Sequence, residues 1–163
     1  MRKKRGIHWE LLQEFVTRKQ NADSVDLLIM DYNNDGYNDF SIYTAIEPNS
    51  ANERRNVFIF DKSYDTLIPI KNSSNYPNLR YNKALDCLDS WEIYAGSSTI
   101  FLELEQDSLR EFAGVSLFDD VREIYTINIH GKLKVLKKGN HKDLDVYQRY
   151  TNFRPLRVEQ EVL

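Results

Sequence analysis

The stretch Asp31-Tyr32-Asn33-Asn34-Asp35-Gly36-Tyr37-Asn38-Asp39 is the most informative part of the chain. Side chains with oxygen donors stand at positions 1, 3, 5 and 9 of this loop, and Gly36 stands at position 6. Such spacing can wrap a hard cation such as Ca²⁺, which takes roughly six to eight oxygen ligands. The glycine lets the backbone reverse, and the Tyr37 carbonyl can supply position 7. We therefore predict a calcium site whose ligands are Asp31, Asn33, Asp35, Tyr37 and Asp39.

The residues on either side decide which kind of calcium loop this is. An EF-hand requires a bidentate Glu at position 12, and Ile42 occupies that position here. The run 25–30 is apolar and rich in strand-forming residues, and the run 40–44 alternates with period two. We therefore expect a β-hairpin in which Asp39 replaces the missing Glu. The alternative is a metal-free turn, because Asn/Asp/Gly sequences are ordinary hairpin turns.

Length and composition favour a single, mainly β domain. The chain has 163 residues with ten Tyr and eight Phe, and turn residues separate its apolar runs at short intervals. We predict an antiparallel β-sandwich with its core at about 7–138, a C-terminal extension at 139–163, and room for a short N- or C-terminal helix. The segment 7–16 fits a helical face and a strand alternation equally. The expected strands are 24–30, 40–45, 56–61, 66–70, 80–88, 90–94, 98–104, 123–129 and 132–136.

Charge and hydropathy narrow the class of protein. A net charge of −3 gives no electrostatic case for nucleic acid, and no stretch of about 18 apolar residues predicts a membrane span. Cys87 is the only cysteine, so no intrachain disulfide forms, and a small buried side chain is expected there. The basic start, residues 1–5, lacks a following apolar region and is not an intact signal peptide. The chain is either cytoplasmic or begins after a removed leader, and a calcium loop of modest affinity favours the second.

Three segments, in order, resemble a known family. The resemblance covers roughly residues 20–138, and the segments are Val-Asp-Leu-Leu-Ile-Met-Asp-Tyr-Asn-Asn-Asp-Gly-Tyr-Asn-Asp-Phe (25–40), Asn-Val-Phe-Ile-Phe-Asp-Lys (56–62) and Tyr-Thr-Ile-Asn-Ile-His-Gly-Lys-Leu-Lys-Val-Leu (125–136). The family consists of Gram-negative periplasmic proteins and lipoproteins with an aspartate-rich calcium loop. They are β-sandwiches similar to the periplasmic inhibitor of invertebrate-type lysozyme. Some members look like immunity proteins against cell-wall-degrading toxins delivered by secretion systems.

The resemblance implies a location and a partner. It implies Ca²⁺ in the loop, a place in the periplasm or on the cell surface, a precursor that could carry a lipid anchor, and a lysozyme-type or toxin muramidase as protein partner. Lysozyme inhibitors of this kind resemble one another in a Ser-Gly-x-Tyr loop that plugs the enzyme cleft. The nearest match here is Ala95-Gly96-Ser97-Ser98, which has no Tyr after it. The partner-binding residues implied in this way are Gly96, Ser97 and Ser98.

No arrangement in the sequence predicts catalysis. The three histidines have no metal or triad spacing, and the Asp119-Asp120 pair with Glu123 fits a solvated face. We therefore expect a protein that is not an enzyme and that binds and neutralises a peptidoglycan-degrading enzyme. The alternative is a calcium-dependent cell-surface or glycan-binding scaffold module. A hydrolase is the third class, and it depends on the isolated carboxylates alone.

Overall fold

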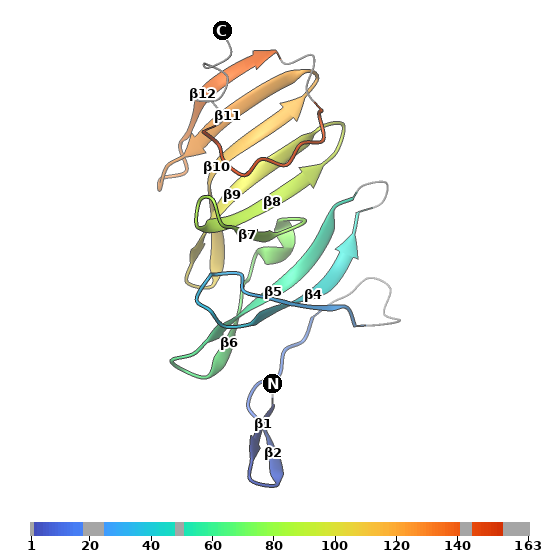
Figure 1. Ribbon diagram of the computed structural model, residues 1–163, viewed down its shortest axis with the longest axis vertical. Coiled ribbons are helices and arrows are strands. Elements are labelled where there is room, and N and C mark those ends of the chain that lie inside the picture. The colour runs from blue at the N-terminus through green and yellow to red at the C-terminus, as the bar shows by residue number, and fades with distance from the viewer. Residues whose placement is uncertain (1, 18–24, 48–50, 141–144, 155–163) are drawn as a thin grey trace.

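The chain folds into three antiparallel sheets (Figure 1). The computed structural model describes residues 2–17, 25–47, 51–140 and 145–154. Within these residues the sheets have the orders β1-β2, β12-β11-β10-β9-β8-β7 and β3-β4-β5-β6. The strands are β1 (Arg2–Arg5), β2 (His8–Leu11), β3 (Leu27–Met30), β4 (Asp39–Ile46), β5 (Glu53–Asp61), β6 (Thr66–Pro69), β7 (Arg80–Asn82), β8 (Cys87–Ile93), β9 (Ser97–Glu105), β10 (Ser108–Phe118), β11 (Val121–Ile127) and β12 (Leu133–Asn140).

The two larger sheets pack against each other through one apolar core. Strand alternation brings every second side chain of each sheet to the shared face. The four-stranded sheet and its loops supply Tyr32, Val57, Ile59 and Ile70, and the six-stranded sheet supplies Leu88, Ile100, Leu102 and Leu109. The predicted antiparallel β-sandwich is thereby confirmed.

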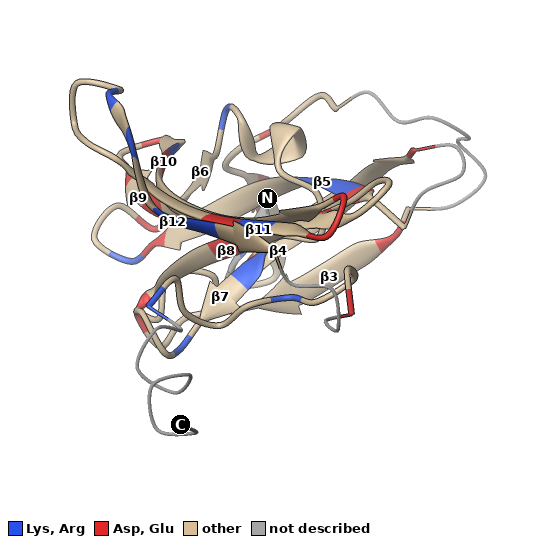
Figure 2. Ribbon diagram, turned by 90° about the horizontal axis from the view of Figure 1, so that it is seen from above, with Lys and Arg blue, Asp and Glu red and all other residues tan. Residues whose placement is uncertain are grey.

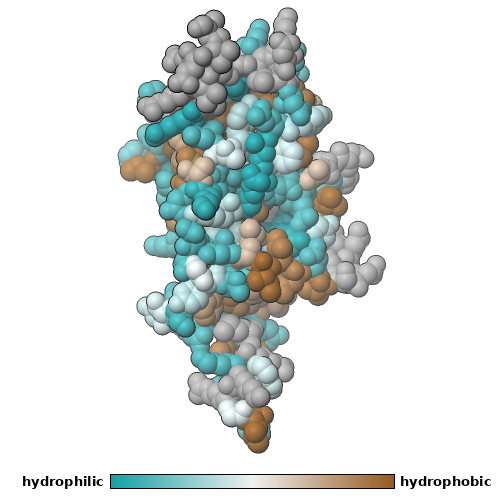
Figure 3. All heavy atoms as spheres, in the orientation of Figure 1, coloured by the Kyte–Doolittle hydropathy of each residue, from teal (hydrophilic) through white to brown (hydrophobic). Residues whose placement is uncertain are grey.

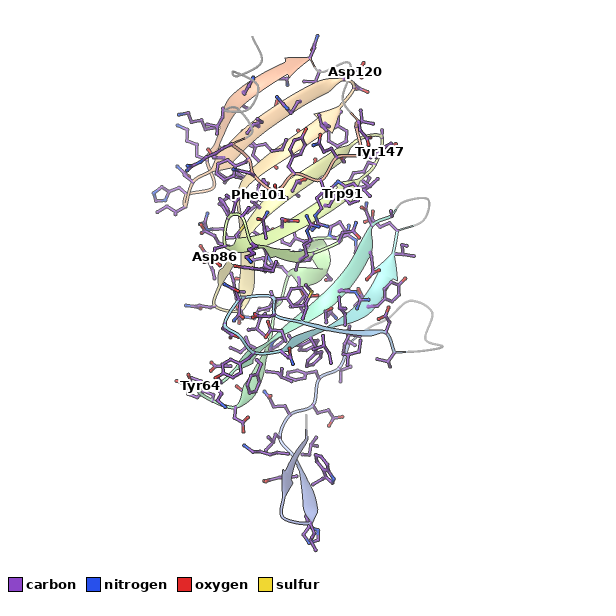
Figure 4. All side chains as sticks on the ribbon, viewed as in Figure 1. Tyr64, Asp86, Trp91, Phe101, Asp120 and Tyr147 are labelled. Atoms are coloured by element: carbon purple, nitrogen blue, oxygen red, sulfur yellow. The ribbon has the colours of Figure 1, made fainter. Side chains whose placement is uncertain are left out.

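The opposite face of the six-stranded sheet is buried as well. Its apolar side chains form a second cluster around Phe101, Val115 and Ile124, and the C-terminal segment 145–154 lies over them (Figure 4). Tyr150 belongs to that cluster, and the Phe153 ring lies 5.7 Å from the Phe101 ring between centroids. The extension predicted from 139 onward is therefore, in its described part, a cover for the sheet.

Two hairpins match the sequence predictions closely. Leu27 pairs with Ile42 and Met30 with Asp39, so the aspartate-rich loop joins two antiparallel strands. β11 and β12 pair from Val121–Asn140 to Ile127–Leu133, and the loop between them contains Gly131. Both hairpins combine alternating apolar residues with a strong turn signal, which is the clearest local pattern for a strand pair.

Three predictions of secondary structure were wrong or incomplete. The strand expected at 80–88 is two strands, β7 and β8, because the chain turns between them and Asp86 adopts a left-handed φ of 50°. No α-helix forms in the described residues, and the ambiguous segment 7–16 contains the short strand β2. β10, with 11 residues, was not predicted, and its register shifts between Glu111 and Ala113.

Two observations concern the charge and the hydropathy of the chain. Figure 2 shows Lys and Arg interspersed with Asp and Glu rather than gathered on one face. Among the described residues, no helix is long and apolar enough to cross a membrane.

Candidate functional site

The aspartate-rich loop leaves β3 after Met30 and enters β4 at Asp39. Two residues adopt the left-handed conformation that lets it turn so tightly: Asn34 has a φ of 58° and Gly36 a φ of 83°. Asparagine and glycine are the residues that enter this region most readily. The Tyr32 side chain anchors the loop in the core, where its hydroxyl donates to Ser41 Oγ at 2.8 Å.

The polar side chains of the loop turn inward onto its own backbone. The Asp31 carboxylate accepts the N–H groups of Asp35, at 3.2 Å, and Gly36, at 2.9 Å. Asp35 Oδ1 accepts the Tyr37 N–H at 2.8 Å, and Asn33 Nδ2 donates to Asp35 Oδ2 at 2.9 Å. The side chains predicted at positions 1, 3 and 5 therefore lie together inside one turn.

Asp39 has a different environment. It is almost fully buried, and its two carboxylate oxygens accept the N–H groups of Tyr32 and Phe60, each at 2.8 Å. Burial raises the pKa of Asp39, the two N–H groups oppose that rise, and the charges of Asp35 and Asp31 add to it. Asp39 thus ties the end of the loop to β5, a role that needs no metal.

The donor set fits a hard cation in its chemistry. Asp31, Asn33 and Asp35 offer oxygens only, and a carboxylate oxygen that accepts one N–H retains a second lone pair for a ligand bond. In the described part of the chain, no three Asp, Glu, His or Cys side chains are grouped as a ready metal site. Ca²⁺ would be held by Asp31, Asn33, Asp35 and the Tyr37 carbonyl, and these ligands, like Asp39, stay predictions.

We expect Asp39→Asn to lower the free energy of unfolding by about 1–3 kcal/mol, with EDTA present or absent. An amide can accept one of the two backbone N–H groups, but its NH₂ faces the other donor. Urea unfolding measures the change. Asp35→Asn is the matched control, because Asp35 is exposed, and its cost in EDTA should stay within about 0.5 kcal/mol. Equal losses for both variants in EDTA would show that Asp39 has no special role.

A cleft of about 380 Å³ lies beside the loop. Tyr32 and Asn33 form one wall, and Tyr81, Asp86 and Glu103 from the six-stranded sheet and its turns form the other. The Tyr81 hydroxyl donates to Asp86 Oδ1 at 2.6 Å, and this bond raises the pKa of Tyr81 to about 12. The cleft therefore combines aromatic, amide and carboxylate groups next to the predicted calcium site.

The residues predicted to bind a partner lie in the turn between β8 and β9, which contains Gly96, and at the start of β9, which contains Ser97 and Ser98. Gly96 and Ser97 are buried, and Ser98 is partly buried. A Cβ atom on Gly96 would lie 2.0 Å from the Leu117 carbonyl oxygen, so only glycine fits that close approach. The Ser97 hydroxyl donates to the Val146 carbonyl at 2.7 Å. Gly96 and Ser97 therefore hold the turn in place and leave little surface for a partner.

Two exposed tyrosines are linked to this turn. Tyr94 immediately precedes the turn, and Tyr147 lies on the C-terminal segment between two carbonyls that Ser97 binds, those of Val146 and Gln148 (Figure 4). Each has 49% of its surface exposed. The sequence did not predict either tyrosine as a surface residue of this site, because the link between their segments is a contact between Ser97 and residues 49 and 51 positions away.

Comparison with known proteins adds a fold relationship. No protein-family model and no curated protein matches the sequence. A Xanthomonas type IV secretion system related protein of known structure is similar, with a TM-score of 0.54 and 18% identity. The match covers 68% of this chain and 57% of that protein, so the chain corresponds to little more than half of its length. At this identity the likeness is one of fold.

Proposed function

We propose that this is a non-enzymatic, calcium-binding protein of the periplasm or cell surface that binds and neutralises a peptidoglycan-degrading enzyme. The observation that carries the proposal is the end of the sandwich where Tyr94 and Tyr147 stand exposed on a rigid support. The shared fold with a secretion system related protein is compatible with a role outside the cytoplasm.

Calcium has a structural role in this proposal. It neutralises the carboxylates of Asp31 and Asp35 and fixes the loop between β3 and β4, and it takes no part in a reaction. A loop with few carboxylate ligands has an affinity in the range of sensor and extracellular sites, roughly 10⁻⁵ to 10⁻³ M. Such a site fills where free calcium is high, which supports an exported protein.

The tyrosine end suits protein recognition. Aromatic side chains on a rigid support contribute large contact areas at a low entropic cost, and tyrosine is enriched among residues that dominate binding energy. Here the support is fixed by the Gly96 backbone packing and by the Ser97 hydrogen bonds to the segment that carries Tyr147. A muramidase cleft, which is concave, would accept exposed aromatic side chains of this kind.

We expect the purified protein to inhibit hydrolysis of insoluble peptidoglycan by at least one lysozyme or toxin muramidase at micromolar concentration. Tyr94→Ser and Tyr147→Ser should each weaken binding about 30-fold, which corresponds to the roughly 2 kcal/mol of a dominant contact residue. Biolayer interferometry measures the dissociation constants. Tyr64→Ser is the control, because Tyr64 is 79% exposed in the turn between β5 and β6, well away from Tyr147 (Figure 4).

The proposal fails if no enzyme of a broad panel is bound or inhibited. It also fails in its choice of surface if Tyr64→Ser weakens binding as much as Tyr94→Ser does. Unfolding curves of all three variants establish that a loss of binding reflects a lost contact rather than a lost fold.

Glycan binding is a second candidate function, and the cleft beside the loop favours it. Aromatic rings with amide and carboxylate groups are the usual partners of sugar faces and hydroxyls, and Asn33, Tyr81 and Glu103 supply them here. Titration calorimetry with peptidoglycan fragments separates the two functions. Binding that is lost on Tyr81→Ala and retained on Tyr94→Ser would favour the glycan.

A further inference from the structure

The edges of the two larger sheets differ in how well they are protected. A sheet edge exposes unpaired N–H and C=O groups, and proteins guard such edges with lysines, short strands or covering segments. On the six-stranded sheet, the edge strand β12 carries Lys134 and Lys138. The other edge strand, β7, has three residues, and its Asn82 side chain donates to the Thr151 carbonyl of the C-terminal cover at 3.1 Å.

The four-stranded sheet has one guarded and one open edge. On β6, Leu67 bonds to the side-chain amide of Gln13 in both directions, as a neighbouring strand would, at 3.2 and 2.8 Å. The other edge strand is β3, Leu27-Leu28-Ile29-Met30, and within the described residues it pairs with β4 alone. No charged residue interrupts it. Leu27, Leu28 and Ile29 are exposed, and Figure 3 shows apolar atoms gathered at the position of β3 in Figure 1.

A shallow hollow adjoins this open edge. It has a volume of about 220 Å³ and is lined by Leu27, Ile29, Asn38, Asp39 and Phe40. An aromatic side chain from an added strand could fill such a hollow, because alternate residues of that strand would face the same side of the sheet.

The same chain carries an exposed strand pair without a core of its own. The β1–β2 hairpin projects away from both larger sheets (Figure 1), and Lys3 forms an ion pair with Asp65 near its base. Ile7 is 86% exposed and Trp9 is 62% exposed. An isolated two-stranded hairpin is marginally stable in water, so this arm gains from a third strand or a surface to pack on.

Charge decides between two ways of covering the open edge. Asp26 and Asp31 stand directly beyond the two ends of β3. Asp26 pairs with Arg55 of the same chain at 2.9 Å, so its charge is partly compensated. If β3 paired antiparallel with β3 of a second copy, Asp26 of each copy would lie near Asp31 of the other, and like charges there are destabilising. The arm is complementary instead, because its first strand has the sequence Arg2-Lys3-Lys4-Arg5.

We propose that the β1–β2 arm of one copy docks along β3 of a second copy, and that the exchange is reciprocal and forms a dimer. The arm adds a strand pair to the four-stranded sheet, Trp9 enters the hollow beside Ile29, and the basic strand lies near the acidic ends of β3. The contact does not involve the tyrosine end, and it does not depend on the proposed partner enzyme.

Sedimentation equilibrium on the full chain at micromolar concentrations tests the contact. The wild type should have the mass of a dimer, and Trp9→Ser and Ile29→Lys should each have the mass of a monomer. Val135→Lys is the control, since Val135 is 44% exposed on the guarded edge strand β12, and it should remain dimeric. Thermal unfolding verifies that each variant is folded, which is expected because all three side chains are exposed.

Mixing the two monomeric variants, Trp9→Ser and Ile29→Lys, tests whether the arm of one copy binds β3 of another copy. Trp9→Ser retains an intact β3 and Ile29→Lys retains an intact arm, so the mixture should associate where neither variant does alone. A monomeric wild type overturns the proposal, and so does a mixture that stays monomeric. A Trp9→Ser variant that dimerises normally, or an arm that binds anionic phospholipid vesicles while the protein stays monomeric, overturns it as well.

Discussion

Arg149→Met is expected to lower the free energy of unfolding by about 3–5 kcal/mol, because it removes one partner of a buried ion pair. Asp89 is fully buried on β8, and Arg149 reaches it from the C-terminal segment. Arg149 Nε donates to Asp89 Oδ1 at 2.7 Å, and Nη2 donates to the Asn78 carbonyl at 2.8 Å. Without the guanidinium, the buried Asp89 carboxylate keeps the Asn82 amide at 2.9 Å, and its nearest cation is the half-exposed Arg80 at 3.4 Å.

The same change should release the cover from the sheet. Burial lowers the pKa of Arg149, and the charge and hydrogen bonds of Asp89 oppose that shift, so the ion pair offsets the cost of burying the guanidinium. The segment carries Tyr150 and Phe153 onto the second apolar cluster. Limited proteolysis should therefore cut Arg149→Met within 145–154 faster than it cuts the wild type, in addition to the shift in the urea unfolding curve.

Arg80→Met is the matched control for this prediction. Arg80 Nε lies 3.4 Å from the same Asp89 oxygen, but its side chain is 44% exposed, and an exposed ion pair contributes at most about 1 kcal/mol. Losses of similar size for Arg80→Met and Arg149→Met would contradict the importance given to burial. A small loss for both would mean that the cover is held by its apolar side chains alone.

The hairpins were predictable from sequence because their signals are local. Alternation and turn residues are contained within 25–45 and 121–136, so no distant contact is needed to find them. β10 was missed for a physical reason: the register shift between Glu111 and Ala113 interrupts its alternation. Gly114 weakens the pattern further, although it is required there, since a Cβ atom would lie 2.3 Å from the Tyr125 hydroxyl oxygen.

The candidate site was predictable in its residues but only partly in its geometry. The spacing in 31–39 identifies oxygen-bearing side chains in one turn, and the structure places Asp31, Asn33 and Asp35 there together. Asp39 is buried against β5, where its carboxylate accepts the N–H of Phe60, a residue 21 positions further along the chain. The burial of Ser97 depends on a segment 49 residues away. Contacts between residues so far apart along the chain leave no periodic signal in a single sequence.

Millimolar calcium is expected to raise the midpoint of thermal unfolding by about 5–10 °C relative to EDTA. This shift holds for a site of roughly 10⁻⁵ M, the tight end of the expected range, because millimolar calcium is then about 100 times the dissociation constant and stabilises the folded state by about 2.7 kcal/mol. Each kcal/mol shifts the midpoint of a chain of this size by roughly 2–4 °C. The physical source is the cluster of Asp31, Asp35 and Asp39, whose mutual repulsion the cation relieves. Magnesium at equal concentration should have a smaller effect, because it gives up its water ligands reluctantly.

Asp35→Ala should abolish the calcium shift, because Asp35 supplies a carboxylate at the centre of the loop. Asp120→Asn is the control: it removes an acidic charge from an exposed turn, and it keeps a residue type that tolerates the φ of 61° found there. That variant should retain the full shift. If calcium leaves the wild-type midpoint unchanged, the loop is a metal-free turn held by its own N–H groups and by Asp39. In that case calcium no longer supports the proposal of an exported protein. The contact of the β1–β2 arm with β3 and the Asp89–Arg149 ion pair do not depend on this result.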